Sequence, residues 1–120
     1  MLPKLHRQRY QEFKQALEQM QQVAAGTQPD APKLRQSFLL AQQFFQQQIV
    51  SLDPSDLEPD SEPRVRSYQT EMSKQLRLLE MDVTFLQAAR QPETAKARQL
   101  QLEHRIQTLQ GYCDTLVQLN

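Results

Sequence analysis

The side chains that could support metal or acid–base chemistry are few and widely spaced in this chain. Its two histidines, His6 and His104, belong to different segments, and neither forms an HExxH or Glu-x-x-His pattern. Such patterns place two metal ligands on one face of a helix. Both histidines are therefore expected to be isolated surface residues, and the sequence predicts no metal and no other cofactor.

The single cysteine, Cys113, cannot form an internal disulfide. It lies nine residues after His104, which is roughly 13 Å along a helix that rises about 1.5 Å per residue. The two side chains cannot form a catalytic dyad within that helix. Cys113 also continues the apolar spacing between Leu109 and Leu116, and free cysteines are among the most buried residues. We expect a buried structural thiol.

Charged residues of both signs are interspersed between residues 71 and 82. Glu71, Glu80 and Asp82 are interspersed with Lys74 and Arg77, a pattern typical of exposed ion pairs on a helix surface. The sequence contains no phosphate-binding loop, nucleophile motif or dinucleotide fingerprint. The prediction is a protein that is not an enzyme.

The composition favours helices as the elements that carry these side chains. Glycine occurs only twice, tryptophan is absent, and glutamine recurs throughout the 120 residues. Unbranched polar residues and scarce glycine favour α-helix. A chain of this length fits one domain, so we predict an all-α single domain spanning residues 1–120.

Apolar residues recur at helical spacing in four segments. The recurring positions are Leu5, Tyr10, Phe13, Leu17, Met20 and Ala24; Leu34, Phe38, Ala41, Phe45, Ile49 and Leu52; Val65, Tyr68, Met72, Leu76, Leu79, Val83 and Leu86; and Leu102, Ile106, Leu109, Cys113 and Leu116. Proline, glycine and capping residues separate them, including Gly26 and Ser61, a candidate N-cap. Helices are expected at about 3–25, 32–52, 62–90 and 92–118. Short links within each pair predict an antiparallel four-helix bundle of two hairpins, the third helix being the longest.

An acidic, proline-rich linker at residues 53–61 separates the two hairpins. Residues 51–64 carry one basic and five acidic side chains, a net charge of −4, whereas residues 1–50 carry +3 and residues 65–120 carry +1. The linker could be a solvated connector, could meet the basic start KLHRQR, or could face a partner.

The zero net charge limits the classes of partner. It disfavours nucleic acid and anionic lipid, whose binding depends on excess positive charge. No apolar run is long enough to insert into a membrane. Together with the lone cysteine, these features favour a cytoplasmic location.

Two adjacent phenylalanines mark the second predicted helix. Phe45 continues the main apolar face, whereas Phe44 joins Leu40 on an adjoining strip, because neighbouring residues differ by about 100° around a helix. One interpretation is a wide face that contacts two neighbouring helices. The other is that Leu40 and Phe44 form part of a groove or dimer patch.

The third predicted helix presents the same choice. Leu78, Met81, Phe85 and Ala89 form a second stripe beside the main one. Burial against another helix within the bundle explains it, and so does a homodimer formed by pairing hairpins. The sequence leaves both open.

Three stretches resemble a known family: FFQQQIVSLD, SYQTEMSKQLRLLEMDVTFLQAARQP and GYCDTL. They are similar to the PatD family of cyanobacterial proteins associated with control of heterocyst frequency, over about half of the chain. The resemblance implies a cytoplasmic regulator that binds FtsZ, the tubulin-like division protein, and modulates its assembly, thereby influencing cell division and heterocyst differentiation. It supplies no binding residue.

Physical reasoning alone therefore selects the candidate binding residues. An apolar strip beside charge predicts that Leu40 and Phe44, flanked by Leu57 in the linker or by Arg66, contact FtsZ. The competing hypothesis is a helical assembly factor or scaffold for another cytoplasmic or photosynthetic complex.

Overall fold

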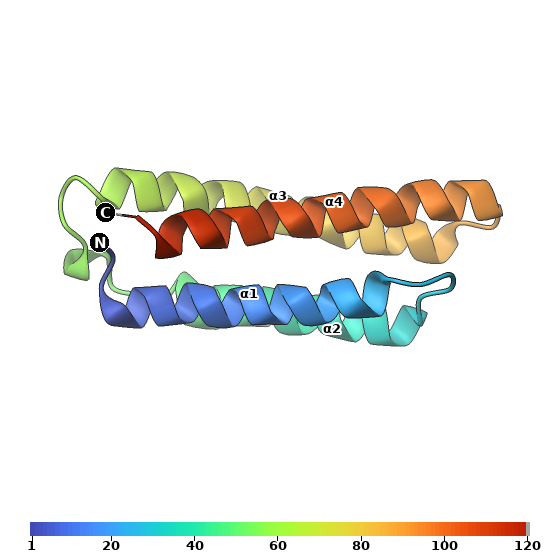
Figure 1. The fold of residues 1–120 in the computed structure, drawn as a ribbon, viewed down its shortest axis with the longest axis horizontal. Coiled ribbons are helices and arrows are strands. Elements are labelled where there is room, and N and C mark those ends of the chain that lie inside the picture. Colours follow the sequence, from blue (N-terminus) through green and yellow to red (C-terminus); the bar gives the residue numbers. More distant parts are fainter. Residues whose placement is uncertain (120) are drawn as a thin grey trace.

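Two helical hairpins lie side by side and form an antiparallel four-helix bundle, as the sequence predicted (Figure 1). The structure is a computed structural model, and it describes residues 1–119. The bundle is elongated, with principal dimensions of 50 × 19 × 18 Å. Both termini lie at the end where the acidic linker crosses from the first hairpin to the second (Figure 1).

The described residues form four α-helices and two short helical turns and contain no strand. In chain order these are α1 (Lys4–Ala24), α2 (Ala31–Phe44), a π-helical turn (Phe45–Ile49), a 3₁₀ turn (Pro54–Asp56), α3 (Glu62–Ala88) and α4 (Pro92–Val117). At 27 residues, α3 is one residue longer than α4. The prediction that the third helix is the longest is confirmed.

The second helix differs from its predicted range of 32–52. Its α-helical part ends at Phe44, and the next turn widens into a π-helix in which the Val50 N–H donates to the Phe45 carbonyl at 3.0 Å. A π turn accommodates one additional residue per turn. Phe45 and Ile49 both lie in the core, and the helical path ends three residues earlier than expected.

Local residue chemistry explains most helix ends. Gly26 follows α1 with a φ of 114°, a conformation that favours glycine. The Asp30 carboxylate caps α2 by accepting the Lys33 N–H at 3.1 Å. Pro92 is the first residue of α4, where its missing N–H costs no hydrogen bond. Ser61 precedes α3, but its side chain makes no capping hydrogen bond.

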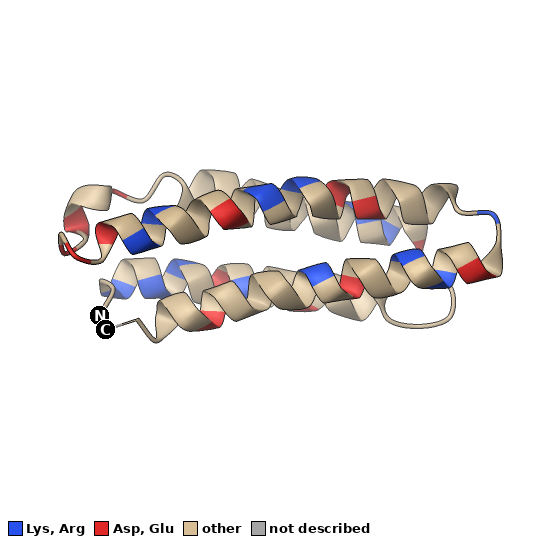
Figure 2. Ribbon diagram, turned by 90° about the horizontal axis from the view of Figure 1, so that it is seen from above, with Lys and Arg blue, Asp and Glu red and all other residues tan. Residues whose placement is uncertain are grey.

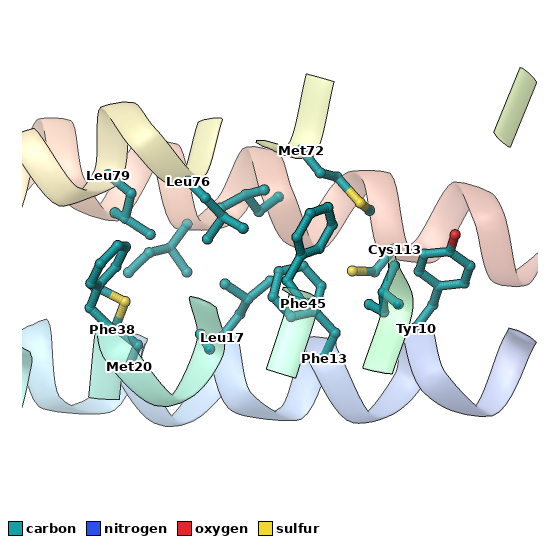
Figure 3. Packing of buried hydrophobic residues seen from close by; sticks show 14 of the residues in the cluster. Tyr10, Phe13, Leu17, Met20, Phe38, Phe45, Met72, Leu76, Leu79 and Cys113 are labelled. Carbon is teal, nitrogen blue, oxygen red and sulfur yellow. The ribbon is translucent and has the colours of Figure 1, made fainter. Parts of the chain in front are cut away.

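The core runs the length of the bundle and is formed by the predicted stripes (Figure 3). Each helix contributes to it: Tyr10 comes from α1, Phe45 from the π turn after α2, Met72 from α3 and Cys113 from α4. The prediction that Leu5 belongs to the buried stripe and the prediction that His6 lies on the surface are both wrong. Leu5 is 47% exposed, and His6 is buried in its place. Because His6, Tyr10 and Phe13 follow i, i+4, i+7 spacing, His6 lies on the inward face of α1.

The hairpins are joined mainly through α1 and α4, while α2 and α3 make fewer contacts. Polar side chains bridge that weaker seam: Arg35 donates to Thr84 Oγ1 and Gln87 Oε1 at 3.2 Å each. On the other side, Lys14 and Asp114 form an ion pair at 2.6 Å. The four helices are therefore held by a continuous core and by side-chain bonds at its edges.

Candidate functional site

The acidic linker is an ordered cap on one end of the bundle. The Asp53 carboxylate accepts the Ser55 N–H at 2.9 Å and starts the 3₁₀ turn. This backbone hydrogen bond lowers the pKa of Asp53 because it stabilises the carboxylate. Figure 2 shows that the acidic positions of the linker lie at the end of the bundle that holds both termini.

A cavity of about 150 Å³ lies beneath this turn, and we call it the connector pocket. Apolar side chains from the linker and α3 form much of its wall, and polar side chains from α1 and α3 complete it. Its lining consists of His6, Val50, Leu52, Pro54, Leu57, Glu62, Val65, Arg66 and Gln69. The pocket thus joins His6 of α1 to residues 50–69, which are distant from it in sequence.

His6 is the unusual member of this wall. It was expected on the surface, but it is only 1% exposed. Neither ring nitrogen has a hydrogen-bond partner among the described residues. Nε2 lies 3.8 Å from Asp56 Oδ2, which is too far for a hydrogen bond. A buried polar group without a partner costs about 1–3 kcal/mol, so His6 retains hydrogen-bonding capacity that the folded chain leaves unused.

Two predicted site residues lie on this pocket. Leu57 is half-buried against the core, and Arg66 projects from the first turns of α3. The Arg66 side chain is 73% exposed and pairs with Glu62 one turn earlier. Gln69 donates to the Tyr10 hydroxyl at 2.9 Å and fixes α3 against α1. The pocket wall is therefore anchored to the core, while its rim is open to solvent.

The other two predicted site residues lie elsewhere. Phe44 is half-buried, and its ring stacks on Phe13 with centroids 6.5 Å apart and planes 3° apart. Leu40 is 55% exposed and lines a separate hollow between α1 and α2, together with Val23. The structure brings together Leu57 and Arg66 but does not place Leu40 or Phe44 in the connector pocket. The wide-face interpretation accounts for Phe44.

Sequence reasoning also misplaced one charged residue. Asp82 was expected in a surface ion pair, but it is 4% exposed. Its Oδ2 accepts a hydrogen bond from Arg105 Nε at 2.5 Å, so the pair links α3 to α4. Glu71 and Lys74 do form an exposed pair, at 3.5 Å. Because Asp82 and Arg105 lie 23 positions apart, spacing within α3 gives no sign of their contact.

Cys113 and His104 do not line the connector pocket. Burial raises the pKa of Cys113 to about 12, so its thiol stays protonated at neutral pH. His104 is exposed on α4, as predicted. Within residues 1–119, no group of three or more His, Cys, Asp or Glu side chains is arranged to hold a metal ion.

Comparison with protein families gives a match at residues 50–110, to the CRR41 C-terminal domain. The match covers just over half of the 120 residues. The chain belongs to the CRR41 C-terminal domain family. Separate searches of curated proteins and of solved structures gave no match.

The segment matched to the CRR41 C-terminal domain contains most of the connector pocket. It starts at Val50, includes the linker and α3, and ends within α4. Of the pocket lining, only His6 lies outside the matched segment. The match does not include α1 or the α-helical part of α2. None of the helices within residues 1–119 is long and apolar enough to cross a membrane.

Proposed function

We propose that this protein is a non-enzymatic cytoplasmic regulator that binds FtsZ through the connector pocket and modulates FtsZ assembly. Through that effect it influences cell division and heterocyst frequency. The choice of FtsZ rests on the PatD resemblance of the stretches that begin at Phe44, Ser67 and Gly111. The choice of surface rests on the connector pocket, and its unpartnered histidine is the observation that carries it.

The pocket has the features of a site that receives one side chain of a partner. Its volume of about 150 Å³ is small for a cofactor, since ligand pockets commonly measure about 300–1,000 Å³. Val50, Leu57 and Val65 supply apolar wall, and His6 supplies a hydrogen-bonding group. A partner side chain with an apolar body and a polar tip would pack its body against the apolar wall and form a hydrogen bond with His6 through its tip. Anchors of this kind carry much of the energy of protein interfaces.

Asp56 controls access to His6 in this proposal. The ring nitrogens of His6 have almost no accessible surface, while the Asp56 side chain is 57% exposed and sits over Nε2 at 3.8 Å. A small outward rotation of that exposed carboxylate would open the imidazole to the partner. The rim carries both signs of charge, the net −4 of residues 51–64 and the exposed guanidinium of Arg66, so a partner segment that presents both signs would be complementary to it.

Sedimentation of FtsZ polymers formed with GTP tests this function. The amounts of pelleted FtsZ and of co-pelleted protein are measured with the natural sequence, with Leu57→Ala and with Arg66→Ala. We expect dose-dependent co-pelleting and a changed FtsZ pellet, with both variants binding at least about fivefold more weakly. Leu100→Ala is the matched control, because Leu100 is 57% exposed on α4 and does not line the pocket.

Two results would reject the proposal. Absence of co-pelleting together with an unchanged FtsZ pellet would remove FtsZ as the partner. Co-pelleting that Leu57→Ala and Arg66→Ala leave unchanged would keep FtsZ but remove the connector pocket as its binding surface. Circular dichroism of each variant confirms that the helices remain folded.

The second candidate function is that of a helical assembly factor or scaffold for another cytoplasmic or photosynthetic complex. The match to the CRR41 C-terminal domain at residues 50–110 names no division protein, so it leaves this second function open. Affinity capture from a cell lysate with the natural sequence and with Leu57→Ala separates the two. Division proteins lost with Leu57→Ala support the first function, and subunits of a membrane complex lost in the same way support the second.

A further inference from the structure

A second surface lies between α3 and α4, away from the connector pocket. It is an open groove of about 610 Å³, and we call it the α3–α4 groove. Its lining consists of Leu78, Met81, Asp82, Phe85, Glu93, Thr94, Ala97, Arg98, Gln101 and Arg105. Figure 2 views the molecule from the side of α3 and α4 and shows both signs of charge along the two helices.

The groove exposes large apolar side chains beside a fixed ion pair. Met81 is 49% exposed and Phe85 is 41% exposed. Asp82 and Arg105 lie between the helices, and Arg105 also donates to Gln75 Oε1 at 3.3 Å. Their charges neutralise each other. Exposed aromatic, methionine and arginine side chains gathered in one groove are typical of the centres of protein interfaces.

Two further charges in the groove have no such partner. The guanidinium of Arg98 lies over the Phe85 ring, 4.8 Å from its centroid, and this contact holds the side chain in place. Glu93 lines the groove one turn nearer the start of α4. Within residues 1–119, neither Arg98 nor Glu93 takes part in an ion pair. The groove therefore offers one positive and one negative charge beside its apolar centre.

We propose that the α3–α4 groove is the contact face of a two-fold symmetric homodimer. In such an interface the same patch meets itself, so the patch must be complementary to itself. A two-fold axis that passes between Arg98 and Glu93 pairs Arg98 of one copy with Glu93 of the other, and each copy then covers the exposed Met81 and Phe85 side chains of its partner. A partner of a single charge sign would leave either Arg98 or Glu93 without a counter-charge. The zero net charge of the chain removes long-range repulsion between copies.

The dimer has one consequence that rests on the proposed function. Two copies joined at their grooves would present two connector pockets and could hold two FtsZ subunits or two filaments at once. Binding at both pockets would raise the apparent affinity without any new contact, provided that the spacing allows both to engage. Dimer formation itself does not depend on FtsZ.

Sedimentation equilibrium of the protein alone tests the dimer over about a hundredfold range of concentration. The natural sequence is expected to shift from monomer to dimer across that range. Phe85→Ser should weaken dimer formation at least about tenfold. Leu100→Ser is the control, because it also removes an exposed apolar side chain from the same hairpin but lies outside the groove lining. We expect it to match the natural sequence.

Charge reversal tests the symmetry of the contact. Arg98→Glu alone and Glu93→Arg alone each place like charges opposite one another, so each should weaken the dimer several-fold. The chain that carries both changes restores opposite charges across the two-fold axis and should recover most of the affinity. Both substitutions are at exposed positions, and helix content by circular dichroism verifies that all three variants fold.

A monomer at every concentration would overturn the proposal. A dimer that Phe85→Ser leaves unchanged, or single reversals that the combined variant fails to rescue, would overturn it equally. Because the experiment contains no FtsZ, its failure leaves the connector pocket and its proposed partner unaffected.

Discussion

At the scale of single residues, His6 is where this fold departs most from a simple apolar core. Its position on the inward face of α1 could be occupied by leucine, as the i, i+4 spacing to Tyr10 would favour. The residue at this position is instead a histidine whose two ring nitrogens have no hydrogen-bond partner among the described residues. Such local costs to stability often occur at binding sites.

His6→Leu is therefore expected to stabilise the folded chain by about 1 kcal/mol, because it removes a buried polar group that has no partner. Urea unfolding followed by circular dichroism measures the change. The same variant should bind FtsZ more weakly than the natural sequence. A loss of stability on this substitution would show that the imidazole already makes a bond that the fold needs.

Phe44 and Leu40 give a matched test of core against surface. Phe44→Ala should lower the free energy of unfolding by about 2–3 kcal/mol, because the half-buried ring loses its contact with Phe13. Leu40→Ala should change it by no more than about 0.5 kcal/mol, since Leu40 is 55% exposed. Chemical denaturation distinguishes them. Equal effects of the two substitutions would contradict the placement of Phe44 at the edge of the core.

The ionisation of Cys113 should make the free energy of unfolding depend on pH in alkaline solution. Burial raises its pKa from 9.0 to about 12, so between these values the unfolded chain ionises while the folded chain keeps its proton. The folded state then binds more protons, and its stability falls as pH rises from about 9 towards 12, by at most about 1.4 kcal/mol per pH unit for this group. The pH dependence of urea unfolding should be shallower in Cys113→Ala. Identical slopes in the two proteins would indicate that the thiol ionises in the folded state.

At the scale of elements, the apolar spacing was sufficient to predict the four helices and their antiparallel pairing. The stripes along α2, α3 and α4 are regular enough that most of their members are buried, for example Phe38, Leu79 and Leu109. Spacing could not predict the π turn at Phe45–Ile49. Phe45 and Ile49 would face inward whether this turn were α-helical or π-helical. Spacing also could not reveal bonds between elements, such as Asp82 with Arg105.

The helix ends provide a test at this scale. Asp30→Ala should cost about 1 kcal/mol, since the carboxylate accepts the Lys33 N–H at the start of α2. Ser61 precedes α3 without a side-chain capping bond, so Ser61→Ala should cost less than about half as much. Thermal and urea unfolding of both variants compare them. If Ser61→Ala were the more damaging change, the serine would have to cap α3 in solution.

At the scale of the whole molecule, the termini, the basic start of α1 and the acidic linker all meet at one end of an elongated bundle (Figures 1 and 2). The sequence left open whether the acidic linker meets the basic start KLHRQR, faces a partner or is simply solvated. It could not show that the linker folds over His6, because that contact joins residues 50 positions apart. The two surfaces we propose, the connector pocket and the α3–α4 groove, both depend on contacts between helices.

Hydrogen–deuterium exchange of this protein, alone and with polymerised FtsZ, tests whether FtsZ binds at the connector pocket, because it reports on every region of the chain at once. We expect slower amide exchange on mixing in the linker and the first turns of α3, around Leu57 and Arg66, with little change along α2 near Leu40. Protection near Leu40 without protection of the linker, or no protection anywhere, would contradict binding at the connector pocket.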